Sequence, residues 1–561
     1  MPLSRVHVVP GPSSATPTLF GVHRNFIAFG ISIIMLLNIA SMPMKAYLSE
    51  HPPWAALPPP PTYANDSDFN IQTLSGMQAA YSASTLPAAA SFYDDSARNA
   101  QVMRHVLVMS HSPIPVDDCR DQFLVGLPSV LFYGAGIRNV LCAFAAANHS
   151  SPSDHTWDRR GACMYITYFS TAIGHQCVWL RAGNELDGSN TSSYNVYTLV
   201  AAHAVYTYSA FHSFKFAYRV GISLLTLHLM WTKYFVHCRH LEALLRRRGH
   251  RARLRAQSHW RYEVLYGDPT AIILMHPGVA TAFFLDCWLS VEVISLVIPR
   301  ASQSADVGVM VLAFMYLSRT VWFAYSAVCL VASYLKRRHK EHLFYEVDPT
   351  IIAVGTTFYG PAVTWAMGHV GPLLTAYHYL FEFGIPASRK EYVIEGSVPS
   401  MLYSISIGFI PLVYGFVGAL CHRRRSRRIL SSVASFYGSF RYNGIKTQAM
   451  FAVLQWMHPS KNVRVPEVGG TIYSLFRQNA RYKQSPTISF RSADCFVYCY
   501  KDNLLVERIR LSLLESLDRN ESAPTLAIRE AKSAPHYSFN QLVDHTPPTI
   551  VRAPKPSEWC L

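Results

Sequence analysis

The chain has 561 residues, of which 50% are hydrophobic and only 15% are charged, and its formal net charge is +16. Soluble domains carry about 25% charged residues, so this composition excludes an ordinary soluble domain and is typical of a membrane protein. The basic residues gather beside apolar runs, which indicates cytoplasmic ends of membrane segments and contact with anionic lipid rather than binding to nucleic acid.

The first apolar run predicts an N-terminal membrane anchor. Residues 1–25 are expected to form a cytoplasmic N-terminus and residues 26–44 the first transmembrane helix. The run is about as long as a bilayer requires, and no small-residue cleavage site follows it directly. We therefore interpret it as a retained signal anchor, with a cleaved signal peptide as the alternative.

Residues 45–195 differ in composition from the rest of the chain and predict an extracellular or lumenal glycosylated domain. Residues 46–195 hold twelve acidic and seven basic side chains, a net charge of −5. Acceptor sequons for N-glycosylation begin at Asn65, Asn148 and Asn190. The segment also holds four cysteines, which predict two disulfides without fixing which of three pairings forms: Cys119, Cys142, Cys163 and Cys177.

One part of this domain is unusually apolar. Residues 123–147 contain a single charge, Arg138. An added span there would put Asn65 and Asn148 on opposite faces of the membrane. We therefore interpret the segment as the core of the domain, with a span and a re-entrant hairpin as alternatives.

The remaining apolar runs predict an all-α multi-pass membrane protein of about six transmembrane helices, built partly from tandem helical hairpins. Residues 196–421 are expected to form a bundle with five further spans, at about 217–238, 270–297, 306–335, 350–378 and 399–421. Residues 196–213 either extend the second span or form a separate one. Basic clusters follow alternate spans, place both termini in the cytoplasm and are expected to contact anionic lipid head groups: Arg246, Arg247 and Arg248; Lys336, Arg337 and Arg338; Arg423, Arg424 and Arg425.

Residues 422–561 are expected to form a cytoplasmic tail. Within it, residues 495–500 predict a strand. Residues 504–517 predict an amphipathic helix, because apolar residues recur there at helical spacing.

A short motif occurs twice and predicts an internal repeat. The triplet Asp-Pro-Thr begins at Asp268 and again at Asp348, 80 residues later, and each copy opens an apolar run. Asp is a good N-cap and Pro is tolerated at the first helical position, so the triplet predicts a helix start. Soon after each triplet comes a Gly/Pro pair, at Pro277 and at Pro361. Matched helix breaks in repeated halves indicate a transport pathway, while kinking and close packing are the alternative role.

Ionisable residues inside the predicted spans are further candidates for a transport pathway. Asp286 and Glu292 lie in the expected third span, Arg319 in the fourth and His369 in the fifth. In an antiparallel hairpin Asp286 and Arg319 lie at similar depth, so these two side chains are expected to be able to pair. A structural ion pair and an ion or proton relay are both compatible with the pattern.

The leading functional hypothesis from sequence is a transporter or channel for a small solute or ion, with Asp286, Glu292, Arg319, His369, Pro277 and Pro361 along its path. The alternative is a receptor, adhesion or scaffold protein with a ligand-binding ectodomain. The chain has no recognised catalytic or phosphate-binding motif. The histidines inside the apolar runs are not one helical turn apart, and the pair His237 and His240, three residues apart at the inner end of a run, is too small for a metal site alone. We therefore expect no catalytic residues, cofactor or metal, a plasma or secretory-pathway membrane location, and leave a homo-oligomer open.

Overall fold

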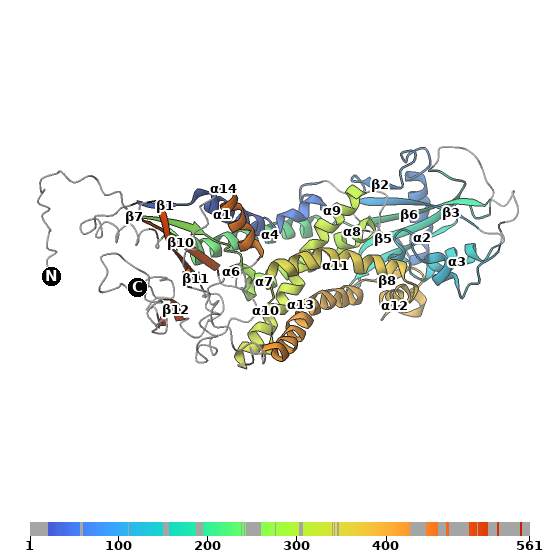
Figure 1. Cartoon of the computed structure of the whole chain (residues 1–561). Coiled ribbons are helices and arrows are strands. Elements are labelled where there is room, and N and C mark those ends of the chain that lie inside the picture. The colour runs from blue at the N-terminus through green and yellow to red at the C-terminus, as the bar shows by residue number, and fades with distance from the viewer. Residues whose placement is uncertain are drawn as a thin grey trace, which may run out of the picture.

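The structure is a computed structural model of the whole chain. It describes residues 21–426 apart from short gaps, together with parts of the tail, 445–457, 467–469, 493–501, 503–513, 524–526 and 550–552. The gaps are 56–59, 110–111, 148, 150–155, 187–194, 237, 240–241, 243–259, 275, 302–306, 339, 341–342 and 345–346. The molecule is elongated, with a sheet at each end and a layer of helices between them (Figure 1).

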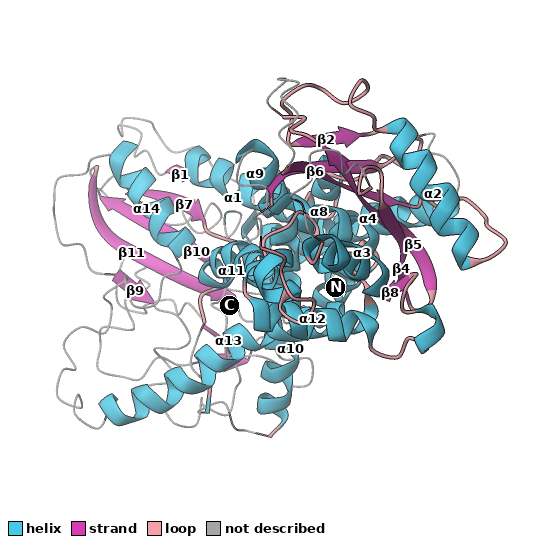
Figure 2. Cartoon of the chain, turned by 90° about the vertical axis from the view of Figure 1, so that its right-hand side faces the viewer, coloured by secondary structure: helices cyan, strands magenta, loops and turns pink. Residues whose placement is uncertain are grey.

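A six-stranded sheet forms one end of the molecule, and we call it with its helices the disulfide domain. Its strands lie in the order β2-β3-β6-β5-β4-β8. They are β2 Phe92–Asp95, β3 Ala100–Val108, β6 Val196–Val205, β5 Thr171–Ala182, β4 Gly161–Tyr168 and β8 Val393–Glu395. Neighbours pair antiparallel except β4 and β8, which are parallel. Figure 2, which looks onto this end, shows the sheet curving along one side of the helices.

Both faces of this sheet are covered. Alternate residues of a strand point to opposite faces. On one face Trp179 and Val200 pack with Phe69 of α2 (Asp66–Ala80). On the other, Val178 and Leu199 pack with α3 (Ala135–Ala145), α12 (Gly371–Glu382) and the short turns η2 (Arg120–Leu124) and η3 (Val130–Phe132). The apolar segment 123–147 therefore lies in the core of this domain.

The two disulfides predicted from the cysteine count are present, and both lie in this domain. Cys119 pairs with Cys142, and Cys163 pairs with Cys177. The first joins the start of η2 to α3. The second joins directly opposed residues of β4 and β5. Disulfides persist in oxidising compartments, so they are consistent with an extracellular or secretory location.

Removing the second disulfide is expected to weaken the sheet measurably. The bond closes a loop with a sequence separation of 14 residues, and the loss of this constraint on the unfolded chain costs about 3 kcal/mol. The double variant Cys163→Ala/Cys177→Ala should lower the opening free energy of β4 and β5, measured by amide hydrogen exchange, by about that amount. Cys421→Ala, which removes an exposed free thiol, is the control. An unchanged exchange rate in β4 and β5 would contradict the expectation.

A second sheet lies at the opposite end, and we call it the basal sheet. Its strand order is β1-β7-β10-β11-β9, and a separate pair joins β12 to β13. The strands are β1 Gly21–Arg24, β7 Trp260–Tyr266, β10 Ala493–Lys501, β11 Leu504–Leu513, β9 Glu467–Gly469, β12 Pro524–Leu526 and β13 Ile550–Arg552. Helix α14 (Ile445–Met457) packs on it through Met450 and Leu454, which contact Phe496 and Leu265. The basal sheet thus joins segments from the start, the middle and the end of the chain.

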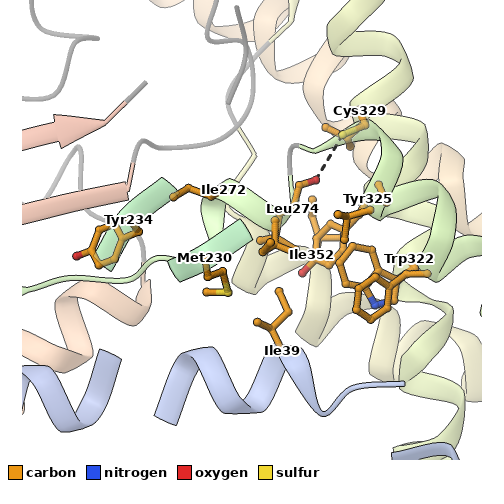
Figure 3. Close-up of a cluster of buried hydrophobic side chains, with 14 of the residues drawn as sticks. Ile39, Met230, Tyr234, Ile272, Leu274, Trp322, Tyr325, Cys329 and Ile352 are labelled. Atoms are coloured by element: carbon orange, nitrogen blue, oxygen red, sulfur yellow. Dashed lines mark hydrogen bonds between the residues drawn. The ribbon is translucent and has the colours of Figure 1, made fainter. Parts of the chain in front are cut away.

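The helical layer between the sheets has one large hydrophobic core. Its helices are α1 Phe26–Ala40, α4 Ser209–Met230, α6 Ala271–Leu274, α7 Pro277–Trp288, α8 Val291–Ala301, α9 Val307–Leu317, α10 Val321–Arg337, α11 Pro349–His369 and α13 Ser397–Ser426. Short turns accompany them: η1 Met44–Leu48, η4 Trp231–Phe235, η5 Ser318–Thr320 and η7 Ala387–Arg389. Figure 3 shows how α1, α4, α6, α10 and α11 meet, with Ile39, Met230, Leu274, Trp322 and Ile352 side by side.

The all-α fold class predicted from sequence is wrong, because the protein is a mixed α/β protein with sheets at both ends. The misleading segment was 196–213. Residues Val196–Val205 form β6, a central strand that is buried on both faces. Such a strand is a continuous apolar run without alternation, and periodicity cannot distinguish it from a buried helix.

The expected count of about six spans is not supported either. Among the described residues two helical segments are long and apolar enough to cross a membrane, Val307–Leu335 and Ser397–Cys421. A third qualifies only if α7 and α8, which meet at a bend of 69°, are taken as one span. The first apolar run gives a helix of only 15 residues, α1, and the second predicted span begins with a helix that carries Lys215 and Arg219. Apolar composition alone overcounted the spans.

The tail prediction was half right. Residues 495–500 lie in strand β10, as predicted. The amphipathic helix expected at 504–517 is wrong, because Leu504–Leu513 forms β11, which pairs antiparallel with β10. The apolar residues Leu505, Ile509 and Leu513 fit a helical spacing of four and a strand spacing of two equally well, and the partner strand decides between them.

The two Asp-Pro-Thr triplets behave differently. Asp348 is the N-cap of α11, where its carboxylate accepts a hydrogen bond from the Thr350 amide at 2.8 Å, as predicted. Asp268 accepts from the Thr270 amide at 2.9 Å but opens only the four-residue helix α6. Pro277 begins α7, directly after the interruption that separates α7 from α6, whereas Pro361 lies buried inside the continuous α11. A helix is therefore interrupted at the first of these two prolines but not at the second, and the two breaks do not match.

Candidate functional site

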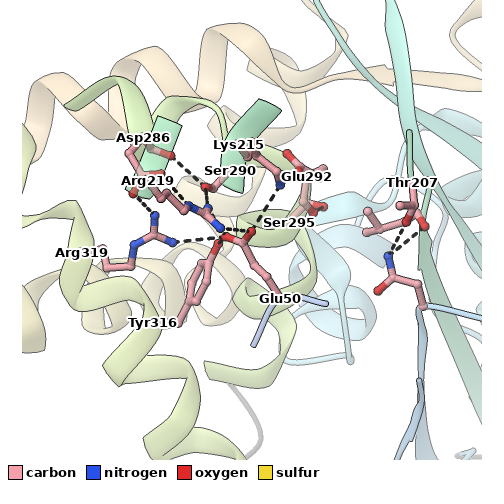
Figure 4. A network of polar contacts seen from close by, with 12 residues as sticks. Glu50, Thr207, Lys215, Arg219, Asp286, Ser290, Glu292, Ser295, Tyr316 and Arg319 are labelled. Carbon is pink, nitrogen blue, oxygen red and sulfur yellow. Dashed lines mark hydrogen bonds and ion pairs between the residues drawn. The ribbon is translucent and has the colours of Figure 1, made fainter. Parts of the chain in front are cut away.

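Six charged side chains meet in the interior where the helical layer joins the disulfide domain, and we call them the ion cluster. They are Glu50, Lys215, Arg219, Asp286, Glu292 and Arg319. They come from the segment after η1, from α4, α7 and α8, and from the turn η5 that precedes α10 (Figure 4). One cluster thus ties together five parts of the chain between residues 50 and 319, of which only α7 and α8 are neighbours in sequence.

Arg219 and Glu50 form the centre of the cluster. The Arg219 guanidinium donates from Nη1 and Nη2 to the two oxygens of Glu50, each at 2.7 Å. It also donates from Nε to Asp286 Oδ1 at 2.8 Å and from Nη2 to Ser290 Oγ at 2.7 Å. This forked geometry uses the planar donor set that only arginine provides.

Two further cations flank this central pair. Lys215 donates to Glu292 and, at 3.3 Å, to Glu50. Arg319 donates to Asp286 and, at 3.3 Å, to Glu50. Tyr316 adds a neutral donor, with its hydroxyl 2.6 Å from Glu50 Oε1. Glu50 therefore accepts from three cations and one phenol.

The cluster is buried and electrically balanced. Its three carboxylates face three cations, and no side chain among the six is more than 7% exposed. Burial by itself would raise the pKa of the Glu50 carboxyl, but Lys215, Arg219 and Arg319 hold that pKa well below its ordinary value. Each charge thus depends on its partners, because an unpaired buried charge costs several kcal/mol.

A sharp bend between α7 and α8 positions two of the three acidic members of the cluster. The two helices meet at 69°, with Asp286 before the bend and Glu292 after it. Ser290 lies at the bend, donates to the Asp286 carbonyl at 2.8 Å and accepts from Arg219. The bend lets two carboxylates six residues apart face cations from different elements.

The same bend connects the ion cluster to the disulfide domain. Ser295 of α8 lies 3.2 Å from His203 of β6, and the other ring nitrogen of His203 lies 2.9 Å from Gln176 of β5. Further along α8, Arg300 donates to Asp94 of β2 at 2.9 Å. Helix α8 therefore contacts both the sheet and the ion cluster.

A pocket lies on the other side of this bend, and we call it the junction pocket. Its cavity volume is about 60 Å³, and with the adjoining space that is open to solvent it contains about 760 Å³ not filled by atoms. Its walls come from α7, α8, α10, α11, α12, α13, the turn η3 and the strands β4 and β5. The residues used below are Tyr168, Trp288, Ser295, Thr364, Ser400 and Ser404.

The structure brings together only some of the residues predicted from sequence. Asp286, Glu292 and Arg319 share the ion cluster, and the pairing of Asp286 with Arg319 is present. His369 lies apart, stacked on Trp365 at the exposed end of α11. The prolines Pro277 and Pro361 are not in the cluster. Sequence reasoning missed Glu50, which sits in a Pro-rich segment outside every apolar run.

The predicted glycosylation sites and the first basic cluster lie partly outside the described residues. Asn65 is exposed and caps α2, and its side-chain oxygen accepts from the Asp68 amide at 2.8 Å. Asn148, Asn190 and the cluster at Arg246, Arg247 and Arg248 lie outside the described residues. No group of three or more His, Cys, Asp or Glu side chains in the described part of the chain is arranged to hold a metal ion.

Comparison with protein-family models, with curated proteins and with solved structures finds no significant match to this chain. The function must therefore be argued from the ion cluster, the junction pocket and the surfaces of the molecule itself.

Proposed function

We propose that this is an integral membrane protein with its disulfide domain on the extracellular or lumenal side and its basal sheet in the cytoplasm. Large apolar side chains remain exposed along the helical layer, among them Leu330, Phe358, Phe409 and Leu420. An apolar surface of this kind is expected to face lipid. The basic ends of α10 and α13 point away from the disulfides, which supports the same orientation.

This orientation predicts opposite accessibility at two described positions. Asn65 should carry an N-glycan, so that Asn65→Gln lowers the apparent mass by one glycan. Cys421, the exposed thiol near the end of α13, should react with a membrane-impermeant maleimide only after the cells are permeabilised. The experiment uses the variant Cys499→Ser/Cys560→Ser as the parent protein, so that these two tail cysteines do not contribute to the labelling of Cys421. Labelling of Cys421 on sealed cells would place this end of α13 outside.

Within this arrangement, we propose that the protein is a receptor that couples its disulfide domain to its helices. The observation that carries this proposal is the balanced ion cluster at the junction. It clamps the helices together, and α8 extends the clamp to β2 and β6. A change in the disulfide domain would therefore act on α4, α7 and α10 through one connected set of charged side chains.

The test is amide hydrogen exchange on the full-length protein in nanodiscs. Glu50→Gln removes the charge at the centre of the cluster, and exchange should rise in the basal sheet as well as at the junction. Glu395→Gln is the matched control. Its carboxylate accepts hydrogen bonds at the edge of the disulfide domain, from Thr167 and the Phe169 amide, so exchange should rise only nearby. A rise confined to the surroundings of Glu50 would refute the coupling.

Transport of a small solute or ion is the second candidate, favoured by one observation. The bend between α7 and α8 carries ionisable groups on both sides, and interrupted helices with charges are a feature of transporter sites. Flux through proteoliposomes containing the native protein, abolished by Arg319→Gln in a folded protein, would favour transport. Flux absent under broad ion and solute gradients would favour the receptor.

A further inference from the structure

The junction pocket has an unusual distribution of polar groups. The hydroxyls of Ser295, Thr364 and Ser404 donate to backbone carbonyls of their own helices, at 2.6, 2.9 and 2.8 Å. By contrast, Trp288 Nε1 and Tyr168 Oη are buried and have no hydrogen-bond partner among the residues that the structure describes. The two rings are neighbours, with centroids 6.1 Å apart. Buried donors without partners are costly, so this pair is suited to an incoming acceptor.

The charge of the lining narrows the class of acceptor. None of the described residues that line the pocket is ionised at neutral pH. Burial and the nearby Glu395 carboxylate raise the pKa of Tyr168. An anionic headgroup would lie near the Glu395 carboxylate beside Tyr168 and find no cation in the walls, and a cationic one would face a donor-only indole. A neutral oxygen, such as a hydroxyl or an ester carbonyl, fits these groups.

The shape and position of the pocket restrict which apolar group the ligand can carry. The free space is limited and most of its walls are aliphatic or aromatic, which suits a slender hydrocarbon chain better than a wide ring system or two chains. One wall is α13, which presents Ser400 and Ser404 to the pocket and carries Leu402 and Ile405 with large exposed fractions. The pocket therefore lies beside the surface that we assign to the bilayer.

From these observations we propose that the junction pocket binds a neutral single-chain lipid, whose headgroup oxygen accepts hydrogen bonds from Trp288 and Tyr168. The proposal gives the ligand class of the proposed receptor. Binding of the lipid does not depend on the receptor function, but a response of the protein to the bound lipid does. Trp288 and Val291 line the pocket on either side of the bend that holds Asp286 and Glu292 in the ion cluster. A bound chain would thus stabilise one geometry of the bend.

The binding test uses photolabelling of the full-length protein in nanodiscs with a diazirine-bearing monoacylglycerol. Saturable labelling is expected on the peptides around Trp288 and Ser400. Ser400→Phe should abolish it by filling the pocket. Leu402→Phe, which introduces the same side chain on the exposed face of α13, should leave the labelling intact. Trp288→Phe removes the indole N–H donor but keeps an aromatic ring, and it should weaken binding roughly two- to tenfold. It carries the test if Ser400→Phe does not fold.

Besides an absence of labelling, three results would overturn the proposal. They are labelling that Ser400→Phe leaves unchanged in a folded protein, equal labelling by a diazirine-bearing fatty acid, and equal labelling by a two-chain phosphatidylcholine probe. Amide hydrogen exchange with and without monoacylglycerol distinguishes a failure of the lipid site from a failure of the receptor proposal. Saturable labelling without a change of exchange in the basal sheet keeps the lipid site and refutes coupling. Absent labelling, with the Glu50→Gln effect intact, refutes the lipid site alone.

Discussion

Replacement of Arg219 by Met is expected to destabilise the protein by about 3–5 kcal/mol, the cost of breaking a buried ion pair from one side. The change leaves Glu50 without its two shortest charged contacts and Asp286 without one of its two cations. The methionine side chain keeps most of the volume, so the loss is electrostatic rather than a packing defect. Unfolding by urea or heat in detergent, with intrinsic fluorescence as the readout, measures the loss.

The decisive comparison is the double variant Arg219→Met/Glu50→Gln. It removes one charge of each sign and leaves two separate pairs, Lys215 with Glu292 and Arg319 with Asp286. Because the remaining charges are balanced, the double variant should be more stable than Arg219→Met alone, although it lacks more of the native contacts. If the two losses simply add, the cluster is not the interdependent unit described above.

Two buried histidines of β5 and β6 are expected to contribute about 4 kcal/mol to the loss of stability of the disulfide domain between pH 7 and pH 5. Burial lowers the pKa of His175 to about 4, and burial together with His175 lowers that of His203 to about 3. An unfolded histidine has a pKa of about 6.5. The unfolded state therefore binds more protons below pH 6.5, and stability is lost as the pH falls from there toward the folded pKa values. Each group contributes about 2 kcal/mol at pH 5.

The matched control for this pH effect is the double variant His175→Gln/His203→Gln. Glutamine keeps a hydrogen-bonding group beside Tyr206 and Gln176 but does not titrate. Its stability, followed by hydrogen exchange in β5 and β6, should fall by about 4 kcal/mol less between pH 7 and pH 5 than that of the native protein. The carboxylate of Glu50 does not contribute in this window, because its pKa lies well below the ordinary value. If the stability of the variant falls as steeply with pH as that of the native protein, other titrating groups cause the effect.

The position of the disulfide domain in the sequence and the number of its disulfides were predictable, but its fold was not. Four cysteines between two apolar runs sufficed to predict two disulfides. The pairing of Cys163 with Cys177 depends on β4 and β5 being adjacent, which the sequence does not reveal. Strand β6 shows the limit most clearly, because an interior strand covered on both faces has the composition of a membrane helix. Hydropathy reports burial, and it does not report which surroundings produce that burial.

The ion cluster was predictable where its charges interrupt apolar runs. Asp286, Glu292 and Arg319 were visible for that reason, and Arg319 was expected at the depth of Asp286. Glu50 was not visible, because a carboxylate in a Pro-rich segment resembles any solvent-exposed charge until tertiary contacts bury it. The excess of cations over carboxylates within the apolar runs, with Lys215 and Arg219 in addition to Arg319, was the one available signal. It indicated that at least one acidic partner had to come from outside those runs.

The parallel strand β8 has a consequence for the synthesis of this protein. It supplies the last strand of the six-stranded sheet, beside β4, yet it follows the end of β6 by 190 residues, from 205 to 395. At translation rates of about 5–20 residues per second, roughly 10–40 s separate the two. Throughout that interval β4 is an open sheet edge, which is a template for pairing with other chains. Until the final strand arrives, this edge of the nascent protein therefore needs protection by chaperones or by transient pairing within its own chain.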